Sequence, residues 1–101
     1  MKANRSNARS SSGGERPTKA PRVLDELLAD GSMILFHAPS RQLVTLNPTA
    51  ALVWEHCDGA HTPAMIAAEL SALFPGVESV ADDVRSILRQ LQERSVLRDD
   101  R

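Results

Sequence analysis

The fold is decided by the stretch Leu46-Asn47-Pro48-Thr49-Ala50-Ala51-Leu52-Val53-Trp54. Here a segment with alternating apolar and polar residues ends and a helix begins. Asn47 is suited to cap that helix, since its side chain can accept a hydrogen bond from a free backbone N–H of the first turn. Pro48 then stands at the first helical position, where its missing N–H costs nothing. The following residues are almost all apolar, so we expect a buried helix over about residues 48–57.

Upstream of this stretch the pattern predicts a β-hairpin. Residues 32–37 form an apolar run typical of a buried strand, and residues 38–41 contain Pro39 at the second position of a plausible turn. Residues 42–46 then return as the second strand, with side chains alternating between two faces. One face carries Val44 and Leu46, and the other carries Leu43 and Thr45.

Residues 21–30 are ambiguous. Their apolar side chains, Val23, Leu24, Leu27 and Leu28, fall on one helical face. Pro21 could open such a helix and Gly31 could close it. The same residues could also form a short irregular edge strand. The pattern alone favours the helix.

Two further helices are predicted after Gly59, which suits a left-handed cap at the end of the first. The second begins at Thr62-Pro63 and ends at Pro75-Gly76. Its apolar stripe contains Ile66, Ala67, Leu70, Leu73 and Phe74. Ser79 with Asp82 resembles a capping box at the start of the last helix. The apolar face of that helix contains Val80, Val84, Ile87, Leu88 and Leu91, and Val96-Leu97 is expected to return to the core.

The chain is therefore expected to be α+β and winged-helix-like, with a hairpin or three-stranded antiparallel sheet followed by three helices. Its 101 residues allow one small domain, which we place at residues 21–98, and 42% apolar residues suffice for a core. Residues 1–20 are rich in Ser, Arg, Asn and Gly without apolar periodicity, and we expect a disordered basic tail there.

The net charge of −1 conceals a split between the tail and the domain. Residues 1–22 contain six basic residues and one acidic residue, whereas residues 23–101 contain six basic and twelve acidic residues. A domain with a net charge of −6 is a poor match for the phosphate backbone of a nucleic acid. The last helix also opens with Asp82 and Asp83, where a DNA-reading helix would meet phosphates.

The sequence also argues against a membrane span and a secretory signal. No apolar run approaches the length of about 18 residues that a span needs, and the basic N-terminus has no apolar segment after it. Cys57 is the single cysteine and cannot form an internal disulfide, which fits a cytoplasmic protein.

His56, Cys57 and His61 are the candidates for metal or catalytic chemistry. Structural zinc sites usually need four ligands, and no second cluster in the sequence supplies the fourth, so we expect no metal. Nucleophilic catalysis needs a base within hydrogen-bond reach of the nucleophile, and adjacent residues on a helix point in different directions. With no phosphate-binding or dinucleotide motif either, we expect no cofactor and no enzymatic activity.

Two segments resemble the PqqD family. The first runs through Leu46-Asn47-Pro48-Thr49-Ala50-Ala51, Val53-Trp54, Asp58-Gly59, Thr62, Ile66 and Leu70. The second is the closing helix, from Asp83-Val84 through Leu88 and Leu91 to Val96-Leu97. The resemblance covers about residues 23–97. Each of these short motifs alone is weak evidence for the family, and the resemblance is specific because they occur in this order and at this spacing. The chain departs from the family member specialised for pyrroloquinoline quinone synthesis, because its basic tail is long. Pro48 and Trp54 look more like the broader family.

The resemblance implies a three-stranded antiparallel sheet followed by three helices, and it therefore places the first strand at residues 23–28. It also implies a RiPP recognition element, a domain that binds the leader of a ribosomally made precursor peptide for a modifying enzyme. That enzyme would be a radical enzyme, kinase or cyclase. The leader would add a strand along residues 41–46, in a groove completed by residues 80–94.

The peptide-binding candidates follow from that resemblance. They are Arg41, Gln42, Leu43, Val44 and Thr45 on the strand, and Val84, Arg85, Leu88 and Arg89 on the helix. For Arg85 and Arg89 the alternative is a solvated helix face with local pairs such as Arg89–Glu93. For Trp54, core packing is favoured over a role as a partner anchor. The alternative function is a winged-helix DNA-binding regulator, and the exposed edge permits a monomer or a weak homodimer.

Overall fold

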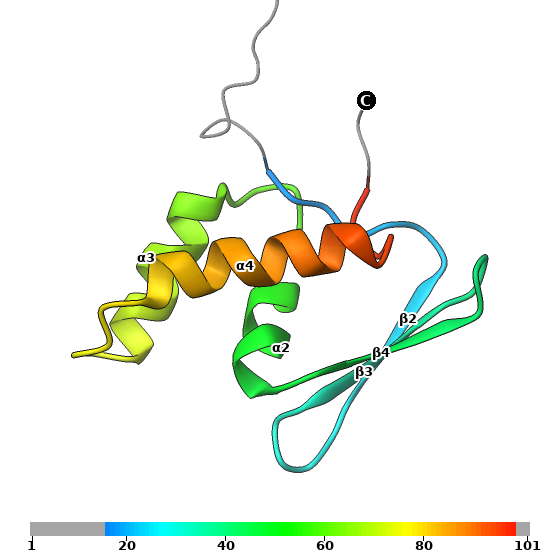
Figure 1. The fold of residues 1–101 in the computed structure, drawn as a ribbon, viewed down its shortest axis with the longest axis horizontal. Coiled ribbons are helices and arrows are strands. Elements are labelled where there is room, and N and C mark those ends of the chain that lie inside the picture. The colour runs from blue at the N-terminus through cyan, green and yellow to red at the C-terminus, as the bar shows by residue number, and fades with distance from the viewer. Residues whose placement is uncertain (1–15, 99–101) are drawn as a thin grey trace, which may run out of the picture.

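The computed structural model describes residues 16–98, which form a three-stranded antiparallel sheet followed by three helices. The elements are β2 (Val23–Leu27), β3 (Met33–His37), β4 (Gln42–Leu46), α2 (Pro48–Glu55), α3 (Pro63–Leu73) and α4 (Val80–Glu93). Figure 1 shows the helices on one side of the domain and the sheet on the other. The expected α+β class and the order of strands and helices are confirmed.

The first strand that the resemblance placed at residues 23–28 is confirmed, because β2 pairs along its whole length with β3. The helix that the apolar pattern favoured over residues 21–30 is wrong. The strand order is β2-β3-β4, so β3 is central and the other two strands lie at the edges. Leu35 at the centre of β3 lies opposite both Asp25 of β2 and Val44 of β4. Apolar spacing could not reveal this strand, because β2 lies at an edge and is largely exposed.

The junction between β4 and α2 forms as expected. Asn47 Oδ1 accepts a hydrogen bond from the Ala50 N–H at 2.8 Å, and Pro48 is the first helical residue. Trp54 is 1% exposed, which confirms its place in the core. Val44 and Leu46 point into the same core, whereas Leu43 and Thr45 are exposed on the opposite face. The cap therefore fixes the direction in which the chain leaves the sheet.

α3 and α4 pack against each other, and α4 also contacts α2. Thr62 Oγ1 accepts from the Met65 N–H at 3.1 Å, as expected for a helix start. The apolar stripe of α3 is only partly buried, since Ile66 and Leu70 are inaccessible but Leu73 is 58% exposed. All the predicted apolar residues of α4 lie in or against the core, and Val96 and Leu97 return to it.

Two predicted helix caps are wrong. α2 ends at Glu55 with His56 as its cap, so Gly59 lies too far along the chain to close it. Gly59 instead takes its left-handed φ of 80° in the loop that follows, where its N–H donates to Pro17 O. Ser79 makes no capping hydrogen bond to the backbone of α4, because its hydroxyl donates to the Asp83 carboxylate instead.

The last part of the segment expected to be disordered packs against the domain. Lys19 N–H donates to Cys57 O and Ala20 N–H to Val96 O, at 3.2 and 2.8 Å, and Lys19 Nζ lies 5.1 Å from the ring centroid of Trp54. These backbone bonds tie residues 16–20 to the end of α2 and to the segment after α4. Residues 1–15, the rest of that expectation, lie outside the described residues. In residues 16–98 no helix is long and apolar enough to cross a membrane.

Candidate functional site

The outer edge of β4 presents backbone groups that β3 does not use. In an antiparallel strand the N–H and C=O of one residue point to the same side, and successive residues alternate. Arg94 Nη2 lies 3.5 Å from Leu43 O, so the carbonyl of Leu43 points away from β3. By the same alternation Thr45 also points outward. The described residues place no strand on this side of β4.

The side chains of these two residues leave the edge accessible. Leu43 is 63% exposed and Thr45 is exposed, and both lie on the face of the sheet turned away from the helices. Between them, Val44 is 6% exposed and packs in the core. The backbone edge is therefore held in place by a buried side chain and flanked by two that reach solvent.

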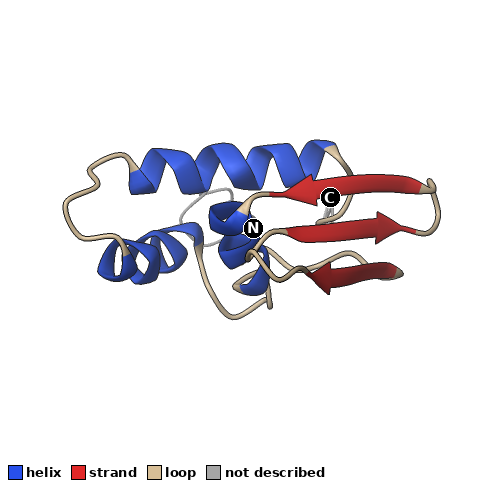
Figure 2. Ribbon diagram, turned by 90° about the horizontal axis from the view of Figure 1, so that it is seen from below, coloured by secondary structure: helices blue, strands red, loops and turns tan. Residues whose placement is uncertain are grey.

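One flank of α4 lies beside this edge. Figure 2 shows the C-terminal end of α4 beside the strand at one edge of the sheet, and Arg94, which follows α4, marks the flank that reaches Leu43. Helix geometry of about 100° per residue places Gln90 and Ile87 within about 40° of Arg94. Ile87 is partly buried against the core and Gln90 is exposed. We call the outward backbone of Leu43 and Thr45, with Ile87, Gln90 and Arg94, the β4–α4 surface.

The structure brings together the strand half of the residues predicted from sequence. Leu43 and Thr45 lie at the open edge, and Arg41 and Gln42 are exposed where β4 begins. Arg41 takes a φ of 59° in the turn before the strand. Val44 is a core residue and supports the edge instead of lining it.

The helix half is not placed at this edge. Val84 and Leu88 are 1% and 9% exposed and pack in the core. Arg85 and Arg89 lie about 180° and about 140° around the helix from Arg94, so they point away from β4. Arg85 pairs with Asp82 at 3.0 Å on the solvent side, in line with the alternative of a solvated face.

Gln90 and Arg94 of the β4–α4 surface were not among the residues predicted from sequence, and Ile87 was assigned to the core alone. The signal was present, because residues 87, 90 and 94 have the spacing of one helical face. It could not be used without knowing which flank of α4 faces the sheet. That flank is set by the tertiary packing of α4 on α2 and α3.

The described residues offer no activated nucleophile at Cys57. The thiol is inaccessible and donates to Val53 O at 3.2 Å. Burial raises the pKa of Cys57 to about 12, so the thiol is protonated at neutral pH. A reactive cysteine needs the opposite environment, partly exposed and electropositive.

A hollow lies elsewhere, beside the C-terminal end of α4. It has a volume of about 350 Å³ and opens on the flank that carries Gln92, away from Arg94. Its lining residues are Ala20, Pro21, Gln92, Ser95, Leu97 and Arg98. The β4–α4 surface is thus an open strand edge and not a pocket, which suits an extended chain better than a small molecule.

Comparisons with known proteins agree with this architecture. The family model for coenzyme PQQ synthesis protein D (PqqD) matches residues 32–97, more than half of the chain. Among solved structures, TbiB1 in complex with the TbiA(beta) leader peptide is similar, with a TM-score of 0.72 at 20% identity over 83% of this chain and 98% of that one. Lasso peptide synthetase B1 complexed with the leader peptide is similar as well, with a TM-score of 0.70 at 23% identity over 83% and 99%. No curated protein matches.

Proposed function

The chain belongs to the PqqD family, and from that premise we propose that it binds the leader segment of a ribosomally made precursor peptide. The observation that carries the proposal is the open backbone edge at Leu43 and Thr45 beside a flank of α4. Both similar structures are complexes with leader peptides. The rest of the precursor would remain free for a modifying enzyme.

Strand addition explains how such an edge binds. A leader strand pairing with β4 would form hydrogen bonds to the outward N–H and C=O groups of Leu43 and Thr45, which gives affinity for any extended chain. Side chains of the added strand alternate between two faces. One set would face Ile87 on α4 and the other would lie beside Leu43, so we expect apolar residues at alternate positions of the leader.

Charge adds a preference for acidic leaders. Arg94 lies at one end of the β4–α4 surface and Arg41 precedes the strand, both exposed. Acidic side chains of the leader would meet these guanidinium groups at the rim, where charge mainly increases the association rate. The domain as a whole is acidic, so this positive rim is local.

We propose no catalytic role for the chain, and a partner enzyme such as a radical enzyme, kinase or cyclase would modify the bound precursor. Cys57 is buried and protonated, which supports a binding module. A winged-helix DNA regulator is not supported, since the matched family and both similar structures are linked to peptides. A cytoplasmic location stays a prediction.

An NMR titration tests the proposal. The ¹⁵N-labelled protein would be mixed with synthetic leader segments of precursors encoded near its gene. We expect the largest shifts at the backbone amides of Leu43 and Thr45 and smaller ones at Ile87, Gln90 and Arg94. A scrambled peptide of the same composition is the control. Shifts confined to the flank of Arg85 and Arg89, or equal responses to both peptides, would contradict the proposed surface.

A further inference from the structure

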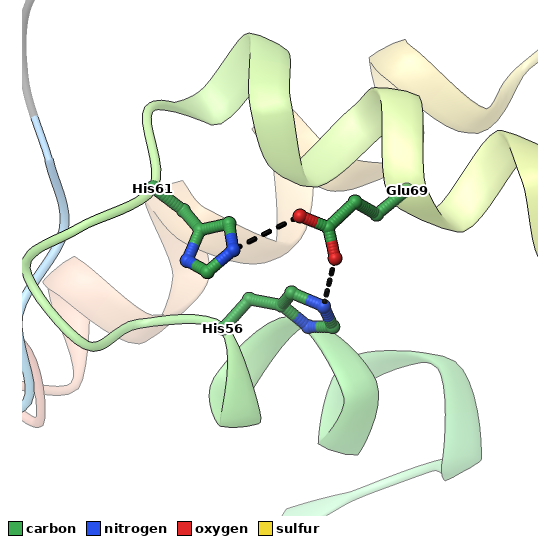
Figure 3. Close-up of side chains that lie close together, drawn as sticks. All are labelled: His56, His61 and Glu69. Carbon is green, nitrogen blue, oxygen red and sulfur yellow. Dashed lines mark hydrogen bonds and ion pairs between the residues drawn. The ribbon is translucent and has the colours of Figure 1, made fainter.

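Two histidines and a glutamate converge between α2 and α3, away from the β4–α4 surface. His56 caps α2, His61 lies in the loop before α3, and Glu69 is on α3 (Figure 3). His56 Nε2 lies 3.0 Å from Glu69 Oε1, and His61 Nε2 lies 2.9 Å from Glu69 Oε2. One ligand atom from each residue lies within 4.8 Å of the others.

The other nitrogen of each ring is already engaged. His56 Nδ1 lies 2.7 Å from Leu52 O, and His61 Nδ1 lies 3.0 Å from Asp58 Oδ1. A carbonyl and a carboxylate only accept hydrogen bonds, so each Nδ1 carries a proton. Each Nε2 faces an oxygen of Glu69 and has two states. In an imidazolium it carries a proton and donates it to the carboxylate, and in a neutral ring it offers a lone pair that can bind a metal ion.

A separation of about 3 Å between Nε2 and a carboxylate oxygen requires a positive group between them, either a proton on the ring or a metal ion in its place. The same arrangement is the one found around bound metals, where a ligating histidine donates its second ring N–H to a carbonyl or carboxylate. Leu52 O and Asp58 Oδ1 are these two supporting acceptors. The rings are also partly shielded, with side chains 20% and 23% exposed.

We propose that His56 Nε2, His61 Nε2 and the Glu69 carboxylate bind a zinc ion. Donors at zinc bond lengths around a tetrahedral ion lie about 3.4 Å apart, close to the separations of 2.9 and 3.0 Å between ring nitrogens and carboxylate oxygens. Glu69 is half exposed and can adjust to the ion. Imidazole and carboxylate together suit zinc.

Three protein ligands leave one position of a tetrahedral ion for water. Cys57 does not fill it, since its side chain is inaccessible and its thiol donates to Val53 O. The ion would join the end of α2, the connecting loop and α3, and would hold the α2–α3 connection in one conformation. Sequence reasoning excluded a metal for want of further ligands, because it could not place Glu69 beside the two histidines.

Isothermal titration of untagged, chelator-treated protein with zinc chloride tests the proposal. We expect one ion per chain, and a loss of affinity of at least about tenfold in Glu69→Gln and in His61→Ala. Asp58→Asn, which removes the charge from the acceptor shared by His61 Nδ1 and the Ala60 N–H, should weaken binding by about tenfold. His37→Ala is the matched control, because His37 bonds to Ser40 in the β3–β4 turn and takes no part in the cluster.

Cobalt spectra and melting curves complete the test. Cobalt bound at this site should show tetrahedral ligand-field bands without a sulfur charge-transfer band. Zinc at 100 times its dissociation constant should raise Tm by about 10–20 °C. The proposal would be overturned by any of three results: no binding heat, equal zinc affinity in His37→Ala and His61→Ala, or a sulfur charge-transfer band in the cobalt spectrum. Leader binding does not depend on these residues, so its outcome is separate.

Discussion

The indole N–H of Trp54 donates to the carboxylate of Asp25 at 2.9 Å, which joins the buried helix α2 to the edge strand β2. Trp54 is 1% exposed, and its N–H has a polar partner only because Asp25 points to the helix side of the sheet. β2 contributes little else to the core, since four of its five residues are exposed. This bond is therefore a specific anchor for a strand that burial alone holds weakly.

Replacing Asp25 should destabilise the domain. Asp25→Ala leaves the indole N–H of Trp54 buried without a partner, and we expect the free energy of unfolding to fall by about 1–3 kcal/mol. Urea unfolding followed by tryptophan fluorescence measures the change. Asp25→Asn keeps an acceptor oxygen and should recover much of the loss. Glu26→Ala, one residue along and on the opposite face, should change stability by less than about 0.5 kcal/mol.

The N-cap of α2 should contribute to the free energy of unfolding about as much as the bond between Trp54 and Asp25. Asn47→Ala removes the acceptor for the Ala50 N–H, and we expect a loss of about 1 kcal/mol in unfolding free energy. Asn47→Asp retains the acceptor and adds a favourable charge at the helix N-terminus, so its stability should match or exceed that of the original. If both variants lost stability equally, the role of Asn47 would have to be something other than capping.

Sequence signals that act within one helical turn predicted the starts of α2 and α3 correctly. Asn47-Pro48 and Thr62-Pro63 mark helix starts by chemistry confined to one turn, and both starts were predicted correctly. β2 was not predictable by pattern, because its place depends on pairing with β3 and on the contact of Asp25 with Trp54, 29 residues away. The resemblance to PqqD supplied that long-range information.

The candidate site shows the same division. The resemblance to PqqD placed the leader along residues 41–46, and alternation along that one segment separates the exposed Leu43 and Thr45 from the buried Val44. The helix residues depend on which flank of α4 faces β4, and in the structure Arg94 lies beside Leu43 whereas Arg85 pairs with Asp82. Glu69 illustrates the point again, since its proximity to His56 arises only from the packing of α3 beside the end of α2.

Cys57 should be dispensable for function. Cys57→Ala removes one inaccessible thiol, and we expect a stability loss of about 1 kcal/mol with unchanged leader affinity. Fluorescence anisotropy with a labelled leader measures the affinity under conditions where both proteins are folded. Loss of binding or of precursor processing in folded Cys57→Ala would instead favour a direct chemical role for the thiol.

Arg94 should contribute charge to leader recognition. Its contact with Leu43 O is exposed and 3.5 Å long, so the contact itself contributes little. Arg94→Gln should weaken binding of an acidic leader by about threefold to tenfold, mainly through a slower association rate, and should flatten its salt dependence. Stopped-flow measurements at two salt concentrations test this. Arg85→Gln removes the same charge from the other side of α4 and should leave both rates unchanged; the reverse result would return the site to the flank predicted from sequence.

Proline substitutions can distinguish the outer edge of β4, where the leader would bind, from the edge that pairs with β3. Thr45 directs its N–H outward, so Thr45→Pro removes a donor for the leader while sparing the ladder with β3, and proline is tolerated at such edge positions. We expect leader affinity to fall by at least about tenfold, with circular dichroism unchanged. Val44→Pro is the opposite case, because Val44 pairs with Leu35 in the ladder and is buried. It should destabilise the sheet by about 3 kcal/mol or more. A folded Thr45→Pro protein that binds its leader with full affinity would rule out strand addition at this edge.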